Sequence, residues 1–148
     1  MFLRESNPLR PAPIRNRDNA FFWDGAIQQE LRIQRCNNCG QMQHPPGPMC
    51  PGCLGTDMGY TIASGQGQLY SWIIPRYPAV PMFEEGFIVA LVNLKEGVRV
   101  LSNLCGIEPE EITSGMEVDV FFADTQEQGK VPQFRPRRTE SHPSSKPC

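Results

Sequence analysis

Two Cys-x-x-Cys pairs, Cys36/Cys39 and Cys50/Cys53, constrain the fold of this chain more than any other feature of its sequence. Thiolates two residues apart fit one tight turn, and two such turns facing each other form the tetrahedral S4 cage that zinc prefers. Gly40 follows the first pair, at a position where a positive φ lets the chain turn back. The spacing therefore predicts one structural Zn²⁺ per chain, because four thiolates leave no open coordination position for a substrate.

The same spacing leaves other roles for the four cysteines open. Iron bound by four sulfurs would make a rubredoxin-like electron carrier, since an S4 site suits both metals. A redox motif is disfavoured because no βαβ pattern surrounds either pair. Disulfides require an oxidising compartment, and the N-terminal residues lack the apolar stretch of a secretory signal. Because no apolar run approaches the roughly 20 residues of a membrane span, we expect a cytoplasmic protein with reduced cysteines.

The N-terminal part of the chain predicts an arm followed by one helix. Residues 1–18 place prolines among arginines without periodicity, so we expect an extended arm that is ordered only against a partner. Asp18 or Asn19 is positioned to cap a helix that begins near Ala20. Phe21 and Phe22 are expected to point away from its packed face. That face follows the i, i+3/i+4 spacing of Ala20, Trp23, Ile27 and Leu31.

β-strands account for most of the remaining pattern. Short strands are predicted around the cysteine pairs at 31–35, 42–44 and 58–63, and five further strands at 68–75, 87–94, 98–105, 116–122 and 131–135. A loop at 76–86 and a helical turn starting at Pro109 interrupt this series. Five strands in this order, with a helical insertion between the third and the fourth, are what a small OB-type barrel needs.

These patterns together predict a mainly β fold with an N-terminal helix, a rubredoxin-like zinc ribbon and a five-stranded OB-fold barrel. We expect four segments along the chain. They are an extended arm (1–18), the helix and zinc ribbon (19–60), the barrel (61–136) and a disordered basic tail (137–148).

The charge distribution bears on nucleic-acid binding. Residues 77–134 carry ten acidic residues against three basic ones. A nucleic-acid-binding protein should show a basic stripe over its binding face, so an acidic barrel counts against that function. OB barrels and zinc ribbons nevertheless bind single strands in other proteins, and Tyr70 and Trp72 lie on one predicted strand where they could stack bases. Binding of single-stranded nucleic acid is therefore the alternative function.

A series of short motifs along residues 18–136 resembles one known family in its whole order. The motifs are Phe22-Trp23-Asp24-Gly25, Ile33-Gln34-Arg35-Cys36, the two Cys-x-x-Cys turns, Pro45-Pro46, Gly65-x-Gly67, Tyr70-Ser71-Trp72, Val89-Ala90-Leu91-Val92, Asn103-Leu104 with Gly106, and Phe134-Arg135-Pro136. They are similar to the zinc-ribbon plus OB-fold family first catalogued as domain of unknown function thirty-five. One departure is Gly47, because relatives commonly carry Arg directly after the Pro-Pro pair.

The resemblance implies an accessory role in acyl-CoA metabolism. Members of the family pair with thiolase-superfamily subunits, namely thiolases, hydroxymethylglutaryl-CoA synthases or steroid side-chain aldolases, and the reactive cysteine belongs to that partner. The implied function is a non-catalytic zinc-binding subunit that forms a hetero-oligomer with such an enzyme. In this role the chain would help to bind or channel an acyl-CoA substrate.

Candidate contacts to CoA or to the partner lie near the ribbon–barrel junction and in the 76–86 loop. Arginine side chains grip phosphates through paired hydrogen bonds, and the loop offers an apolar surface to an acyl chain or a partner. The candidates are Arg32, Arg35, Arg76, Tyr77 and Phe83.

The sequence contains no recognisable catalytic constellation. Cys105 lies on a strand that is predicted to be buried and has no obvious base beside it, so we expect an inert core thiol. The two histidines, His44 and His142, belong to no recognisable triad. Four cysteines already complete the metal shell, so His44 is expected in a loop and not at the metal.

Overall fold

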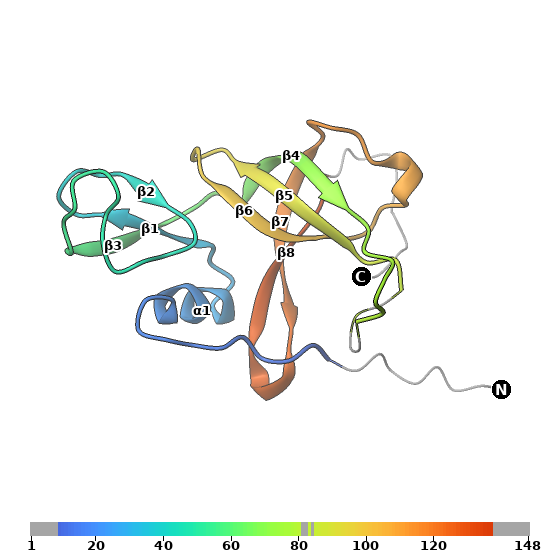
Figure 1. The fold of residues 1–148 in the computed structure, drawn as a ribbon, viewed down its shortest axis with the longest axis horizontal. Coiled ribbons are helices and arrows are strands. Elements are labelled where there is room, and N and C mark those ends of the chain that lie inside the picture. Colours follow the sequence, from blue (N-terminus) through green and yellow to red (C-terminus); the bar gives the residue numbers. More distant parts are fainter. Residues whose placement is uncertain (1–8, 81–82, 84, 138–148) are drawn as a thin grey trace.

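The computed structural model describes residues 9–80, 83 and 85–137 of the chain. One short helix precedes two β units, which lie side by side in Figure 1. The first unit is a three-stranded sheet and the second is a closed five-stranded barrel. The predicted fold class, with its helix, ribbon and barrel, is confirmed.

The three-stranded sheet is built around β1 (Arg32–Cys36), which leads directly into the first cysteine pair. β1 pairs antiparallel with β2 (Met42–Gln43) on one side and with β3 (Met58–Ile62) on the other. The buried Gln34 side chain donates to the Gly47 carbonyl (2.8 Å) and accepts from the Gly47 N–H (2.9 Å). These two bonds tie the loop before Cys50 to the central strand.

The barrel strands are β4 (Gln66–Ile73), β5 (Ile88–Leu94), β6 (Arg99–Leu104), β7 (Glu117–Asp124) and β8 (Lys130–Pro136). They close in the order β4-β5-β6-β8-β7. All neighbouring strands are antiparallel except β6 and β8, whose parallel contact completes the barrel. Along β5, buried and half-buried residues alternate, as expected for a strand with one face in the core. Two short 3-10 helices, η1 (Pro109–Glu111) and η2 (Gln126–Gln128), precede β7 and β8 respectively.

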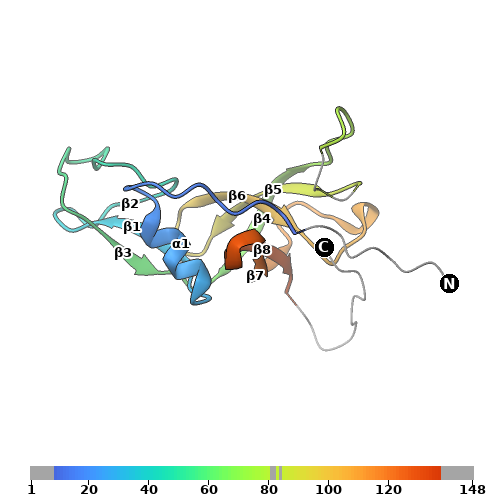
Figure 2. The same ribbon diagram turned by 90° about the horizontal axis from the view of Figure 1, so that it is seen from below.

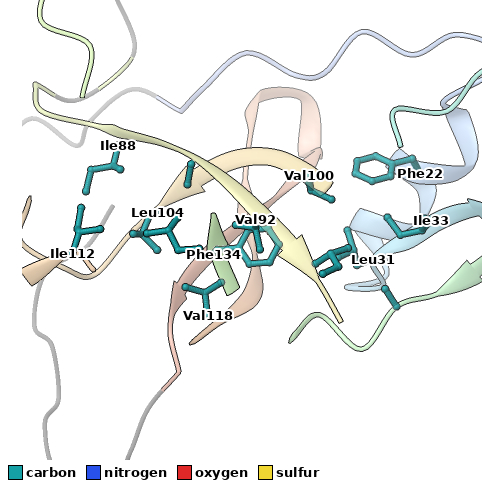
Figure 3. Close-up of a cluster of buried hydrophobic side chains, with 14 residues drawn as sticks. Phe22, Leu31, Ile33, Ile88, Val92, Val100, Leu104, Ile112, Val118 and Phe134 are labelled. Atoms are coloured by element: carbon teal, nitrogen blue, oxygen red, sulfur yellow. The ribbon is translucent and has the colours of Figure 1, made fainter. Parts of the chain in front are cut away.

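One hydrophobic core joins the two β units (Figure 3). Val92, Val118 and Phe134 fill the barrel and are 0% exposed. Phe22 and Ile33 belong to the same cluster on the side of the helix and the ribbon. Burial in one continuous cluster means that the ribbon and the barrel stabilise each other's orientation.

The helix is shorter than predicted and buries a different face. It spans α1 (Ala20–Ile27), and the chain turns at Gln29 with a φ of 61°, so Leu31 lies outside the helix. Phe22 is buried, whereas Ile27 is 45% exposed. The prediction that Phe22 points away from the packed face was wrong, because the short helix places the Phe22 ring in the shared core, with Trp23 partly buried against it. Asn19 occupies the N-cap position without a side-chain capping bond.

Residues 9–15 of the arm lie along the barrel (Figures 1 and 2). Arg10 Nη1 donates to Asn103 Oδ1 at 2.6 Å, and the Arg10 carbonyl accepts from the Gln126 N–H at 2.8 Å. Gln126 Nε2 also donates to the Leu9 carbonyl at 3.0 Å. This part of the predicted arm is therefore held by the chain's own barrel, which differs from the expectation that it orders only against a partner.

The other end of the described chain is also fixed to the barrel. Arg137 forms ion pairs with Glu117 (2.9 Å) and Asp119 (3.2 Å). The rest of the predicted tail lies outside the described residues, as do residues 1–8 of the arm. Within the described part, no helix is both long enough and apolar enough to cross a membrane.

Candidate metal centre and binding surfaces

The four cysteine sulfurs converge at one end of the ribbon sheet, where they all lie within 4.8 Å of one another. Cys36 Sγ lies 3.6 Å from Cys53 Sγ, and Cys39 Sγ lies 3.6 Å from Cys50 Sγ. Four sulfurs bound to one zinc ion at about 2.3 Å stand about 3.8 Å apart. The donor set and its spacing therefore fit a single four-coordinate metal ion.

The two cysteine turns repeat one backbone conformation. The Gly40 N–H donates to the Cys36 carbonyl at 2.9 Å, and the Leu54 N–H donates to the Cys50 carbonyl at 3.0 Å. Both donors have a positive φ, which is 76° at Gly40 and 62° at Leu54. Leucine pays a steric cost in this region that glycine avoids. The sequence predicts the positive φ of Gly40 but not that of Leu54. The equivalent role of Leu54 becomes apparent only when the two turns are compared in the structure.

Backbone N–H groups lower the pKa of the first cysteine in each turn. The pKa of Cys36 is lowered to about 7, chiefly because the Cys39 N–H donates to its sulfur. The pKa of Cys50 is lowered in the same way by the Cys53 N–H. At Cys53 the Gly55 N–H also acts to lower the pKa, but the neighbouring sulfurs outweigh it and raise the pKa to about 11. Thiolates this close repel one another, which a divalent cation would relieve.

The structure does not bring the five candidate ligand residues into one site. The Arg32 guanidinium is already paired with Glu30 (2.7 Å) and lies over the Tyr60 ring (4.7 Å). Arg35 lies on the opposite face of β1, exposed, with its Nε donating to the Gly40 carbonyl at 3.4 Å. These two arginines therefore cannot grip one phosphate together.

The remaining three candidates belong to the loop between β4 and β5. Arg76 is exposed, and Tyr77 is 93% exposed. Phe83 packs against Phe87, with ring centroids 4.7 Å apart, and lies under the Arg10 guanidinium at 4.4 Å. Of the five candidates, Arg35, Arg76 and Tyr77 are the ones whose side chains face solvent.

His44 and Cys105 both pack against other parts of the protein. His44 lies 5.2 Å from the Phe22 ring, and burial lowers the pKa of its imidazole. Cys105 is 5% exposed and is disulfide-bonded, so the predicted burial is confirmed but the predicted free thiol is not. Neither residue offers a reactive group to solvent.

A β-bulge separates the two aromatic residues that nucleic-acid binding would use. The register of β4 against β5 shifts between Leu69 and Ser71. Trp72 consequently pairs with the buried Ala90 and packs against the core, whereas Tyr70 is 51% exposed. The expected pair of stacking platforms is therefore split between the inside and the outside of the barrel.

A groove of about 650 Å³ lies between the N-terminal turn, α1 and the ribbon sheet. The Phe21 and Tyr60 rings form a stacked pair in it, with centroids 5.6 Å apart. Sequence reasoning missed this groove because its walls come from three separate segments. Its lining comprises Arg17, Asp18, Phe21, Gln34, Gly47, Pro48, Thr56, Met58, Gly59 and Tyr60.

Comparison with known proteins places both β units in one family. Residues 23–59 match the model of the ChsH2 rubredoxin-like zinc ribbon domain, and residues 60–123 match the ChsH2 C-terminal OB-fold domain. A solved structure described as "Ltp2-ChsH2(DUF35) aldolase" has a TM-score of 0.80 and 45% sequence identity. The similarity covers 84% of this chain and 98% of that chain.

Curated relatives agree with this placement. The chain is 46% identical over 128 residues to the "Probable enoyl-CoA hydratase alpha subunit" of Thermomonospora curvata, covering 86% of this chain but 40% of that protein. It is 31% identical over 97 residues to a "DUF35 domain-containing scaffold protein" of Methanocaldococcus jannaschii, covering 64% of this chain and 69% of that protein. The chain therefore belongs to the DUF35 family, with a ChsH2-type zinc ribbon followed by a ChsH2-type OB-fold domain.

Proposed function

We propose that this chain is a non-catalytic accessory subunit that assembles with a thiolase-superfamily enzyme and helps to bind or channel an acyl-CoA substrate. One observation carries the proposal. The solved relative with 45% identity and a TM-score of 0.80 is one chain of an aldolase whose description names two proteins. A relative of 46% identity is described as the alpha subunit of an enoyl-CoA hydratase, which supports the substrate class.

The chemistry of the described residues supports an accessory role. The four thiols suited to nucleophilic attack form the metal cluster instead. A closed S4 site has no position for a substrate, so metal bound there stabilises the fold and does not take part in a reaction. We therefore assign Cys36, Cys39, Cys50 and Cys53 to one structural Zn²⁺ per chain.

The solvent-facing candidates give this subunit a means to contact a ligand. Arg76 and Tyr77 stand next to each other on an exposed loop. A guanidinium can bind a CoA phosphate through two parallel hydrogen bonds, and a tyrosine ring adds apolar contact area. We propose this pair, with Arg35 at the ribbon, as contacts for CoA or for the partner. Arg32 and Phe83 act by supporting the surrounding structure.

Co-expression tests the proposal directly. The full chain is produced together with a thiolase-superfamily protein encoded beside its gene, and the mass of the purified species is measured by light scattering. We expect a hetero-oligomer whose acyl-CoA conversion exceeds that of the partner alone. A chain that stays separate from a partner that is fully active alone would refute the proposal.

A further inference from the structure

The outer surface of three neighbouring barrel strands is apolar and exposed. On β4, β5 and β6, Ser71 pairs with Leu91 and Leu91 with Leu101, while Ile73 pairs with Val89. Residues that pair directly across strands share one face of the sheet, so these side chains point away from the barrel interior. We call this surface the β4–β6 wall. Its apolar and cationic members are Tyr70, Ile73, Val89, Leu91, Arg99 and Leu101, of which Val89 and Leu91 are half-buried. The uncharged polar residues Gln68, Ser71, Asn93 and Asn103 lie beside them on the same face.

The exposure of this wall is unusual for the outside of a small barrel. Outward positions of an antiparallel barrel normally carry polar side chains. Here Ile73 is 62% exposed and Leu101 is 66% exposed. Within the described part of the arm, Arg10 donates a hydrogen bond to Asn103, which lies on β6 next to the wall.

The charge of the wall differs from that of the opposite side of the barrel. Among the outward positions of β4, β5 and β6, Arg99 is the single charged residue. Outward positions of β7 and β8 instead carry Glu117, Asp119 and Arg135. The centre of a protein–protein interface, where hot spots concentrate, is poor in Lys, Glu and Asp and rich in Tyr and Arg. The β4–β6 wall has this composition.

Arg99 is held in place with hydrogen-bonding capacity left over. Its guanidinium lies 3.7 Å from the centroid of the Tyr70 ring, and its Nε donates to Asn93 Oδ1 at 2.7 Å. Among the described residues, no carboxylate forms an ion pair with it. A fixed guanidinium without an acidic neighbour is complementary to a carboxylate supplied from outside.

We infer that the β4–β6 wall docks a folded protein partner that is different from this chain and presents an apolar surface with a carboxylate facing Arg99. This inference rests on the proposed function and assigns a surface to it. A second copy of the chain fits less well. Two walls packed face to face would bring together two Arg99 side chains and no acidic group, which like charges disfavour. The heteromeric description of the solved relative agrees with a non-identical partner.

Two isoleucines of nearly equal exposure provide a matched test. Ile73 on the wall is 62% exposed, and Ile62 on the ribbon is 56% exposed. The full chain, its Ile73→Glu variant and its Ile62→Glu variant are titrated with the co-expressed thiolase-superfamily protein. Circular dichroism and zinc content confirm folding. We expect Ile73→Glu to weaken binding at least about thirty-fold and Ile62→Glu less than about threefold. Arg99→Ala should weaken it about tenfold.

Hydrogen exchange on the unmodified chain is a second measurement, and it does not depend on whether a variant folds. Complex formation should slow amide exchange at residues 70–73 and 99–101 and leave residues 117–121 unchanged. Equal binding by the two isoleucine variants, or protection of 117–121 instead, would overturn the wall assignment while leaving the proposed function intact. No binding by the unmodified chain would refute the proposed function itself. If the unmodified chain forms a dimer with itself and Ile73→Glu dissociates that dimer, the wall binds a second copy of the chain and the inference of a different partner is overturned.

Discussion

The ribbon and the barrel differ in what holds their strands together. The barrel closes a sheet around apolar side chains such as Val92, Val118 and Phe134, which have no exposed area. The ribbon sheet has strands of two and five residues, and two of its most buried side chains, Cys36 and Cys50, belong to the metal cluster. Apolar burial can therefore stabilise the barrel by itself, whereas we expect the ribbon to need a metal ion bound by its four cysteines.

The largest expected effect is selective loss of the ribbon on metal removal. Cys39→Ser, or a strong chelator, should unfold residues 31–60 and leave the barrel folded, because binding of structural zinc contributes about 10–16 kcal/mol in small zinc-finger peptides. Cys39 and Cys53 are exposed, which gives a chelator access to the site. Hydrogen exchange should show fast amides in β1 and β3 and slow amides in β5. Asn38→Ser, at a non-ligand position in the same turn, serves as the control.

Simultaneous loss of both units would contradict this division. In that case the shared core, in which Phe22 and Ile33 join the barrel cluster, would couple the ribbon and the barrel into one cooperative unit.

The converse change targets the barrel. Phe134→Ala removes a ring that is 0% exposed and should lower the free energy of unfolding by about 3–5 kcal/mol. Phe121→Ala, on the partner strand of the same hairpin and only half-buried, should cost clearly less. Urea denaturation followed by tryptophan fluorescence measures both variants. Retention of one zinc ion per chain in the Phe134→Ala protein under native conditions would support separate stabilisation of the ribbon and the barrel, and loss of zinc would contradict it.

A smaller effect is expected at the second cysteine turn. Leu54 is 65% exposed and has a φ of 62°, so glycine removes steric strain and little packing. Leu54→Gly should stabilise the zinc-bound ribbon by about 0.5–1 kcal/mol after the greater flexibility of unfolded glycine is deducted. Competition with a chromogenic chelator reports the change as tighter zinc binding. Leu54→Ala retains the strain and should show no gain, whereas Gly40→Ala should weaken binding.

A pH dependence is expected at the contact between the helix and the ribbon. Burial lowers the pKa of His44 in the folded protein, so the unfolded chain binds a proton at a higher pH than the folded chain does. The stability contributed by neutral His44 is present above the unfolded pKa of about 6.5 and is lost as the pH falls below it. Between pH 7 and pH 5 the protein should lose stability relative to His44→Phe, by at most about 1.4 kcal/mol per pH unit.

Comparing the two proteins at each pH isolates His44, because both carry the same zinc site. Parallel stability curves for His44 and His44→Phe would show that the histidine titrates equally in the folded and unfolded states.

Most strand positions followed from local patterns in the sequence. The predicted strands at 87–94 and 98–105 differ from β5 and β6 by only one residue at each of three ends, since a period of two and a Lys95-Glu96-Gly97 turn specify a hairpin locally. The helix face was predicted wrongly because a helix of two turns has too few apolar positions to show whether Phe22 or Trp23 faces the core. The core contributed by the distant barrel made that choice.

The candidate metal centre was predictable and the binding surfaces were not. Four sulfurs at fixed spacing carry their chemistry within 18 consecutive residues, from Cys36 to Cys53. The groove beside Phe21 combines residues from the arm, the helix and the ribbon. The β4–β6 wall likewise depends on the register of three strands and on one bulge, none of which is written in a single stretch of sequence.

The cysteine turns, the strand series and the family of the chain could be predicted from the sequence, because each depends on residues close together along the chain. The surroundings of those parts depend instead on how the whole chain packs. Packing places Phe22 in the core, pairs Arg32 with Glu30 within the ribbon, and leaves Ile73 and Leu101 exposed beside Arg99 on the β4–β6 wall. The physical reason is that burial and pairing are shared between distant segments, so a residue's environment is set by the packing of the whole chain.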